Sequence, residues 1–164
     1  MLTTGKDTHA YQLTIQGLGN GKYEHRIARP APSPVIYTTY LVRSDGFYKL
    51  NQGYRGSFTG GCTFDPPVLQ HTWRLRKAQR WSVTTNCPEN GRDSPKRFDF
   101  EVTSIDTRQS GPPSVTIHEY SRHPNGTNDE CNKTSRFDQA HGLLLDEVTE
   151  CPGIRTHRRL VSRP

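Results

Sequence analysis

The chain has 164 residues, of which only 30% are hydrophobic, so it is long enough for one domain but has few residues for an interior. Its two Trp, seven Tyr and six Phe residues argue against intrinsic disorder, because a solvated tail rarely carries so many large apolar side chains. No apolar run is long enough to cross a membrane as a helix. We therefore expect a folded domain with a small core.

Apolar and polar side chains alternate repeatedly along the chain, whereas no amphipathic helix is evident. The alternation is clear at 11–15, 81–85, 98–102 and 115–117, and it is typical of strands with one solvated face. Residues 35–42 are apolar on both faces, so we expect a central strand there that is covered on both sides. Turn sequences such as Gly19-Asn20-Gly21 and Ser44-Asp45-Gly46 recur at intervals that suit hairpins.

These patterns predict an all-β fold, an antiparallel curved sheet or half-barrel of roughly nine to eleven strands, stapled by disulfides and with little helix. We expect a single β domain over residues 1–152 and a basic C-terminal tail or last edge strand over residues 153–164. The side chains that we expect in the core are Ile36, Tyr40, Trp73, Trp81, Phe98 and Phe100.

Four cysteines lie in polar, turn-rich surroundings, and they are Cys62, Cys87, Cys131 and Cys151. This setting favours disulfide bonds over buried free thiols, and no C-x-x-C pair suggests a zinc or redox site. Three pairings are open. Pairing sequence neighbours would close two loops that each add roughly 3 kcal/mol of stability. Disulfides indicate an oxidising compartment, so we expect a secreted or cell-envelope protein.

The first residues, from Met1 to Lys6, lack the apolar stretch of a signal peptide. If the protein is exported, we expect that a leader has been removed and that Met1 is a start codon added to a mature fragment.

Short motifs occur in a definite order along most of the chain. They are Tyr-x-Leu-x-Ile at 11–15, Ser-Asp-Gly at 44–46, Cys-Thr-Phe-Asp-Pro-Pro-x-Leu at 62–69, Trp-Ser-Val at 81–83 before Cys87, and Phe-Asp-x-x-His-Gly-Leu-Leu-Leu at 137–145. In this order they resemble uncharacterised secreted proteins and lipoproteins of actinobacteria, whose β domains are similar to curved-sheet lipoprotein carriers. The resemblance implies a curved sheet closed by a late Gly-Leu-Leu strand and a place outside the cytoplasm, and it supplies no catalytic residues.

Candidates for a catalytic or metal site are few. None of the seven histidines has H-x-H or H-E-x-x-H spacing, and no G-x-S-x-G motif is present. A hydrolase with a dispersed site is an alternative, in which Asp138, His141 and His118 must converge within ~4 Å. Glu101 and Glu119 could be cross-strand neighbours, as a glycosidase pair requires. We expect no cofactor and no metal, and a function other than catalysis.

Basic residues form two groups in a chain of formal net charge +6. Arg74, Arg76, Lys77 and Arg80 surround an expected hairpin turn, where Arg74 and Arg76 would share the solvated face of a strand over 69–76. Arg155, Arg158 and Arg159 form the second group. Such patches attract polyanions, and in an oxidising compartment an anionic envelope polymer, glycan or lipid is a better partner than nucleic acid.

The sequence thus favours an extracytoplasmic binding or interaction module that holds a lipid or an anionic envelope polymer. A structural subunit of a larger assembly is the other alternative to the hydrolase.

Overall fold

The protein is described by a computed structural model over residues 12–28, 33–56, 59–88, 92–107, 113–122, 130–138 and 144–159. Eleven antiparallel strands form one sheet whose spatial order is the order of the sequence. They are β1 (Gln12–Gly19), β2 (Lys22–Ala28), β3 (Val35–Val42), β4 (Gly46–Arg55), β5 (Gly60–Thr72), β6 (Arg80–Asn86), β7 (Pro95–Asp106), β8 (Ser114–Arg122), β9 (Cys131–Asp138), β10 (Leu144–Cys151) and β11 (Ile154–Arg159). The described ranges contain no helix. The predicted curved all-β sheet is confirmed.

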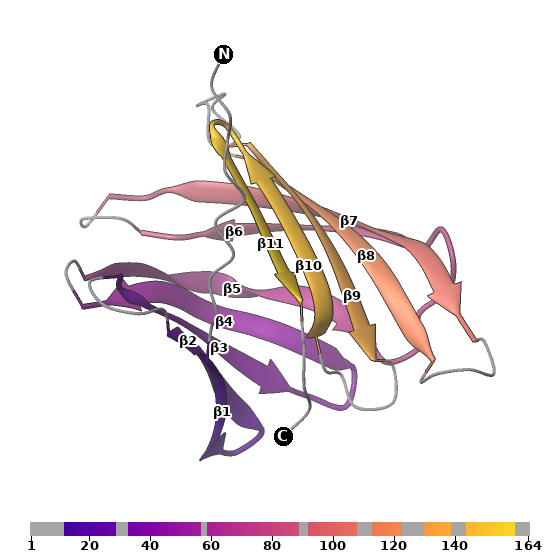
Figure 1. Cartoon of the computed structure of the whole chain (residues 1–164), viewed down its shortest axis with the longest axis horizontal. Helices are drawn as coiled ribbons and strands as arrows, with labels where there is room; N and C mark the ends of the chain where they lie inside the picture. Colours follow the sequence, from indigo (N-terminus) through magenta and orange to yellow (C-terminus); the bar gives the residue numbers. More distant parts are fainter. Residues whose placement is uncertain are drawn as a thin grey trace.

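The sheet is strongly curved but does not close. In Figure 1 the late strands β9–β11 cross over β4 and β5, and side chains from both halves line one hollow. β1 and β11 are the two edges of the sheet. Residues 154–159, at the start of the predicted tail or edge strand, form the edge strand β11. The curvature therefore creates an inner face, which is where the functional groups described below lie.

The hydrophobic core lies between β5, β7 and β8 rather than around residues 35–42. Its buried members are Phe64, Val68, Cys87, Phe98, Phe100, Val102, Val115 and Ile117. Phe98 and Phe100 are therefore core residues as predicted, and Trp81 packs against them while partly buried. The rings of Phe64 and Phe98 meet edge to face with centroids 5.8 Å apart.

Three of the six predicted core residues, Ile36, Tyr40 and Trp73, are not in the core. In β3 only Thr39 is buried, while Ile36 and Tyr40 are half-buried, because β3 is third from the free edge and is not covered on both faces. Trp73 is 45% exposed because β5 ends at Thr72, so the predicted strand does not extend to 76. The aromatic composition indicated a core, but strand order decided which rings enter it.

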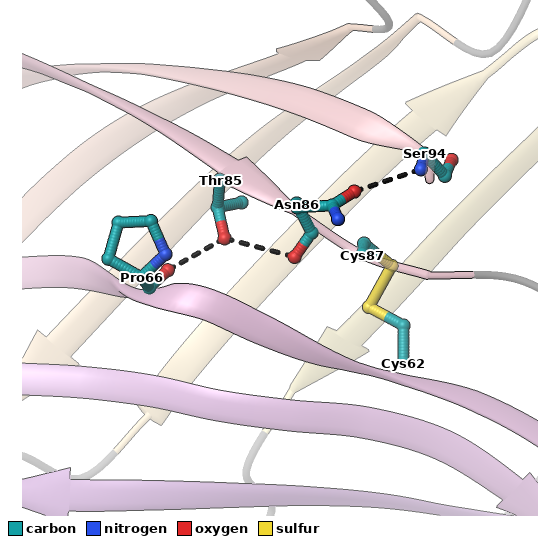
Figure 2. Close-up of a disulfide and its surroundings, with 6 residues drawn as sticks. All are labelled: Cys62, Pro66, Thr85, Asn86, Cys87 and Ser94. Atoms are coloured by element: carbon teal, nitrogen blue, oxygen red, sulfur yellow. Dashed lines mark hydrogen bonds between the residues drawn. A yellow bond between two sulfur atoms is a disulfide. The ribbon is translucent and has the colours of Figure 1, made fainter. Parts of the chain in front are cut away.

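The seam between β5 and β6 is the weakest junction of the sheet. The two strands share one ladder pair, Asp65 with Asn86, and the adjacent Pro66 and Pro67 have no N–H to donate. The Thr85 hydroxyl donates to the Pro66 carbonyl at 2.6 Å. The disulfide from Cys62 to Cys87 ties the same two strands together, as Figure 2 shows. Side-chain contacts and a covalent bond thus replace the missing backbone ladder.

The second disulfide joins Cys131 to Cys151, in the neighbouring strands β9 and β10. All four cysteines are therefore paired, as predicted, and each pairs with its neighbour in sequence. Disulfides of this kind persist in oxidising compartments. None of the described residues belongs to a helix long and apolar enough to cross a membrane.

Candidate functional site

The inner face of the sheet lines a small hollow, open on one side, with a cavity volume of about 50 Å³. We call it the inner hollow. Its walls come from β2–β5 on one side and from β7–β10 on the other. The lining residues are His25, Tyr40, Phe47, Gln70, Phe100, Ile117, Glu119, Lys133, Ser135, Phe137, Leu144 and Glu147. Apolar rings and charged groups therefore face each other across one small space.

Aromatic rings from four neighbouring strands form the first wall. His25 lies 4.7 Å from Tyr40, Tyr40 stacks 4.7 Å from Phe47, and Phe47 stacks 5.3 Å from His71, measured between ring centroids. Burial lowers the pKa of both histidines, although a contact with the Thr72 carbonyl partly offsets this at His71. Both imidazoles are thus held in the neutral form that packs well against aromatic rings.

Ion pairs from β8–β11 form the opposite wall. The ammonium of Lys133 lies 2.5 Å from Glu119 Oε2, and the Arg158 guanidinium lies 3.0 Å from Glu147 Oε1. Although burial opposes ionisation, Lys133 and Lys49 lower the pKa of Glu119, and the two glutamates raise the pKa of Lys133. Glu119 and Lys133 are therefore ionised at neutral pH, because each charge is stabilised by an opposite charge beside it.

Lys49 on β4 is the exception among the inner charges. It is only 4% exposed, and among the described residues it forms no ion pair. Its ammonium lies over the rings of Phe64 and Phe98, 5.1 and 4.9 Å from their centroids. Burial lowers the pKa of Lys49 to about 8, and the attraction of Glu119 opposes this only in part. Lys49 thus holds a charge that no described carboxylate neutralises by contact.

The inner face has more donors and positive charge than it has acceptors to satisfy them. Gln70 Nε2 in the inner hollow and Arg158 Nε beside Glu147 are buried without a hydrogen-bond partner in the described structure. Five charged groups lie in or beside the inner hollow, three cations and two carboxylates, and they are Lys49, Lys133, Arg158, Glu119 and Glu147. Lys96, two positions before Phe98 on β7, acts on Lys49 as a further positive charge. A ligand that brought an oxyanion into the inner hollow would give Gln70 Nε2 an acceptor and offset the excess positive charge.

The inner face continues beyond the inner hollow as a line of apolar side chains, which we call the apolar row. Strand register places Leu13, Ile27, Ile36 and Tyr54 side by side across β1–β4. Ile36 lies four positions before Tyr40 on β3, so the row shares the face of Tyr40 and lies about 13 Å away along the strand. Leu13 is 38% exposed and Tyr54 37%. The row is an accessible apolar surface that continues from the inner hollow.

The residues of the hydrolase hypothesis do not converge. Register pairs His118 with Thr134 and Asp138 with Ser114, so His118 and Asp138 are four positions apart, about 13 Å, instead of ~4 Å. His141 lies outside the described residues. No group of three metal-binding side chains is present in the part of the chain that the structure covers. The predicted convergence is therefore wrong for His118 and Asp138, the two residues of the set that the structure describes.

The proposed carboxylate pair fails for a different reason. Glu101 is opposite His118, whereas Glu119 is opposite Phe100, so register places the two glutamates on opposite faces of the sheet. Glu119 points inward to Lys133, and Glu101 points outward to the guanidinium of Arg80, 3.0 Å away.

The two predicted basic groups have different environments. Arg74, Arg76 and Lys77 are exposed in the β5–β6 connection and form no ion pair with a described carboxylate. Arg155 pairs with Glu150 at 3.1 Å, and Arg159 is exposed on the same outer face. Arg158 alternates with these two and points inward to Glu147, so the C-terminal group is not one patch.

Sequence analysis missed the inner charged cluster. One signal was present, because Glu119 continues the every-second-residue pattern of Val115 and Ile117, and the structure places all three inward. A charged residue at an inward position of a strand is a candidate for function. Comparison of the chain with protein-family models, with curated proteins and with solved structures finds no match.

Proposed function

We propose that the chain is an extracytoplasmic binding module that holds a single-chain amphiphile, a lipid with one carboxylate head group, on the inner face of its sheet. The observation that carries the proposal is the succession, along one face, of unsatisfied buried donors and then an apolar row. Such a face suits a ligand with a polar end and an apolar body.

The head group would lie in the inner hollow. Gln70 Nε2 supplies a donor there, and Lys133 supplies an ammonium of which Glu119 occupies one side. Lys49 lies behind them and adds a positive charge that no described residue pairs. One carboxylate would offset the excess of positive charge in and beside the inner hollow, which supports an anionic head group over a cationic one.

The alkyl chain would run from the inner hollow to the apolar row. The distance of about 13 Å corresponds to about ten methylene groups, so a chain of twelve carbons reaches the row and a chain of four does not. The two disulfides support a place outside the cytoplasm. Membership among secreted proteins or lipoproteins of actinobacteria stays a prediction from the motif order.

The test is calorimetric binding of butyrate, dodecanoate and dodecanol, below the micelle-forming concentrations. We expect dodecanoate to bind at least 100-fold more tightly than butyrate, because each buried methylene tightens binding by up to about four-fold. Dodecanol, which lacks the charge, should bind at least ten-fold more weakly than dodecanoate. Equal binding of all three ligands, or no binding of any, would contradict the proposal.

Two matched variants locate the chain. Leu13→Asp places a charge in the apolar row at an exposed edge position, and it should weaken dodecanoate binding at least ten-fold. Leu18→Asp makes the same change at the exposed tip of the β1–β2 hairpin, outside the row, and should leave the affinity unchanged. If both variants bind dodecanoate alike, the alkyl chain does not lie on the row.

A further inference from the structure

A second surface of the protein combines exposed cations with an exposed indole. It lies where the β3–β4 turn and the β5–β6 connection meet, and we call it the basic end. The indole Nε1 of Trp73 donates to the Arg43 carbonyl at 2.7 Å, which fixes the two segments side by side. The members of the basic end are Arg43, Trp73, Arg74, Arg76 and Lys77. Arg74, Arg76 and Lys77 were predicted from the sequence to form a basic group, whereas Trp73 was expected in the core and Arg43 carried no signal.

The connection that carries the cations is held in a fixed conformation. Ala78 N donates to the Val102 carbonyl at 2.8 Å, and Val102 N donates to the Gln79 carbonyl at 2.9 Å. Leu75 packs against the hydrophobic core between Arg74 and Arg76. The cations are therefore presented on a loop that is bonded to β7, so little backbone entropy is lost when a partner binds.

The charge of the basic end is not balanced by its surroundings. Four of its residues are cationic, whereas one carboxylate, Asp45, lies in the same β3–β4 turn and accepts a hydrogen bond from the Tyr48 hydroxyl at 2.7 Å, so an excess of positive charge remains. By contrast, Arg80 is paired with Glu101, and the arginines of β11 at 155 and 158 are paired with β10 glutamates. The basic end is thus a place where several exposed cations without a described carboxylate partner lie together and are available to a partner.

We propose that the basic end is a docking surface for an extracytoplasmic anionic glycan, a polymer of sugar rings with spaced negative groups. The cations would contact successive anionic groups, and the exposed face of Trp73 would pack on a sugar ring, since its N–H is already satisfied within the protein. Trp73 is the one large apolar side chain exposed in this set, whereas a surface that enters a bilayer presents several.

The test is the binding of a size-defined heparin oligosaccharide as the probe, measured over a range of salt concentrations. Replacing Arg74, Arg76 and Lys77 together with Ala should weaken binding about 100-fold at low salt, at roughly five-fold per cation. It should also flatten the dependence of affinity on salt, because fewer counterions are released. The control replaces Arg136, Arg155 and Arg159 with Ala, an equal change of charge on the outer face of β9 and β11. An equal loss in the control would show that only net charge matters and would overturn the proposal.

Three further measurements decide the class of partner. Trp73→Ala should weaken heparin binding at least three-fold while leaving the salt dependence unchanged, because the ring contact is not ionic. An unchanged affinity would remove the sugar-stacking role and with it the preference for a glycan. Tighter binding to phosphatidylglycerol vesicles, or equal binding to single-stranded DNA of the same charge, would overturn the glycan assignment. None of these outcomes affects the lipid site, which is on the inner face and is measured with dodecanoate.

Discussion

Replacing Lys49 with Met should stabilise the protein at neutral pH. Burial lowers the pKa of this ammonium from 10.5 to about 8, and such a shift corresponds to roughly 3 kcal/mol of unfavourable free energy for the charged form in the fold. The two ring contacts that the variant loses would offset about 1–2 kcal/mol of this. Met keeps most of the volume of the side chain. The expected net effect is a gain of about 1–2 kcal/mol in the free energy of unfolding.

The pH dependence of stability identifies the cause. The pKa of Lys49 is lower in the folded state, so between its folded value of about 8 and its unfolded value of 10.5 the unfolded chain binds more protons. The free energy of unfolding of the native sequence should therefore rise by about 2 kcal/mol between about pH 7.5 and pH 9.5. Higher pH is avoided, because burial raises the pKa of Tyr40 to about 12 and stability falls once unfolded tyrosine ionises near pH 10.

The assay is urea denaturation followed by far-UV circular dichroism at several pH values, without reductant. The Lys49→Met variant should lack the rise with pH. Lys133→Met is the matched comparison, since it removes a cation from the same inner face but leaves Glu119 buried without its partner. It should destabilise the protein by about 3–5 kcal/mol. A native protein whose stability is flat from pH 7.5 to 9.5, or a Lys49→Met variant less stable than it, would refute the reasoning.

Three other outcomes are expected. Dodecanoate affinity should fall several-fold as the pH rises from 7 to 9.5, because Lys49 loses its proton near pH 8 and the positive charge beside the inner hollow decreases. Calorimetry in matched buffers measures the affinity at each pH. Gly53→Ala should cost at least about 2 kcal/mol of stability, because a Cβ there would lie 2.5 Å from the Gly60 carbonyl oxygen and 2.6 Å from the Tyr37 hydroxyl. The control is Gly17→Ala, whose Cβ meets no atom within 4 Å, and it should be nearly neutral in the same denaturation assay. Replacing Cys62 and Cys87 together with Ala should lower the free energy of unfolding by roughly 3 kcal/mol. Amide hydrogen exchange should rise first along the β5–β6 seam, where one ladder pair remains, and a uniform rise along the sheet would contradict a weak seam.

The inner face and the basic end are separate in the fold but connected by packed rings. Trp73 meets His71 edge to face at 5.6 Å, and His71 lies 5.9 Å from Phe137, which lines the inner hollow. A glycan bound at Trp73 would therefore rest against the same group of rings that lines the lipid site. Measuring dodecanoate affinity with and without heparin would give the coupling free energy between the two sites.

Much of the secondary structure follows from the sequence because strand patterning is local. Alternation at 98–102 placed Phe98 and Phe100 inward without knowledge of any neighbour, and Gly19-Asn20-Gly21 forms the β1–β2 turn with positive φ at all three residues. The cysteines indicated disulfides through their polar surroundings. The sequence could not choose among three pairings, since pairing depends on which strands become neighbours.

The candidate site could not be derived in this way, because it consists of contacts between residues far apart in the chain. Lys49 on β4 and Glu119 on β8 face the same interior only because the sheet curves over itself, and alternation alone does not give curvature or register. Register also separated His118 from Asp138 and placed Glu101 on the face opposite Glu119. The sequence alone thus determined the strands, the turns and the presence of cross-links. The tertiary structure decided which polar residues are buried together, because burial depends on what lies across the fold.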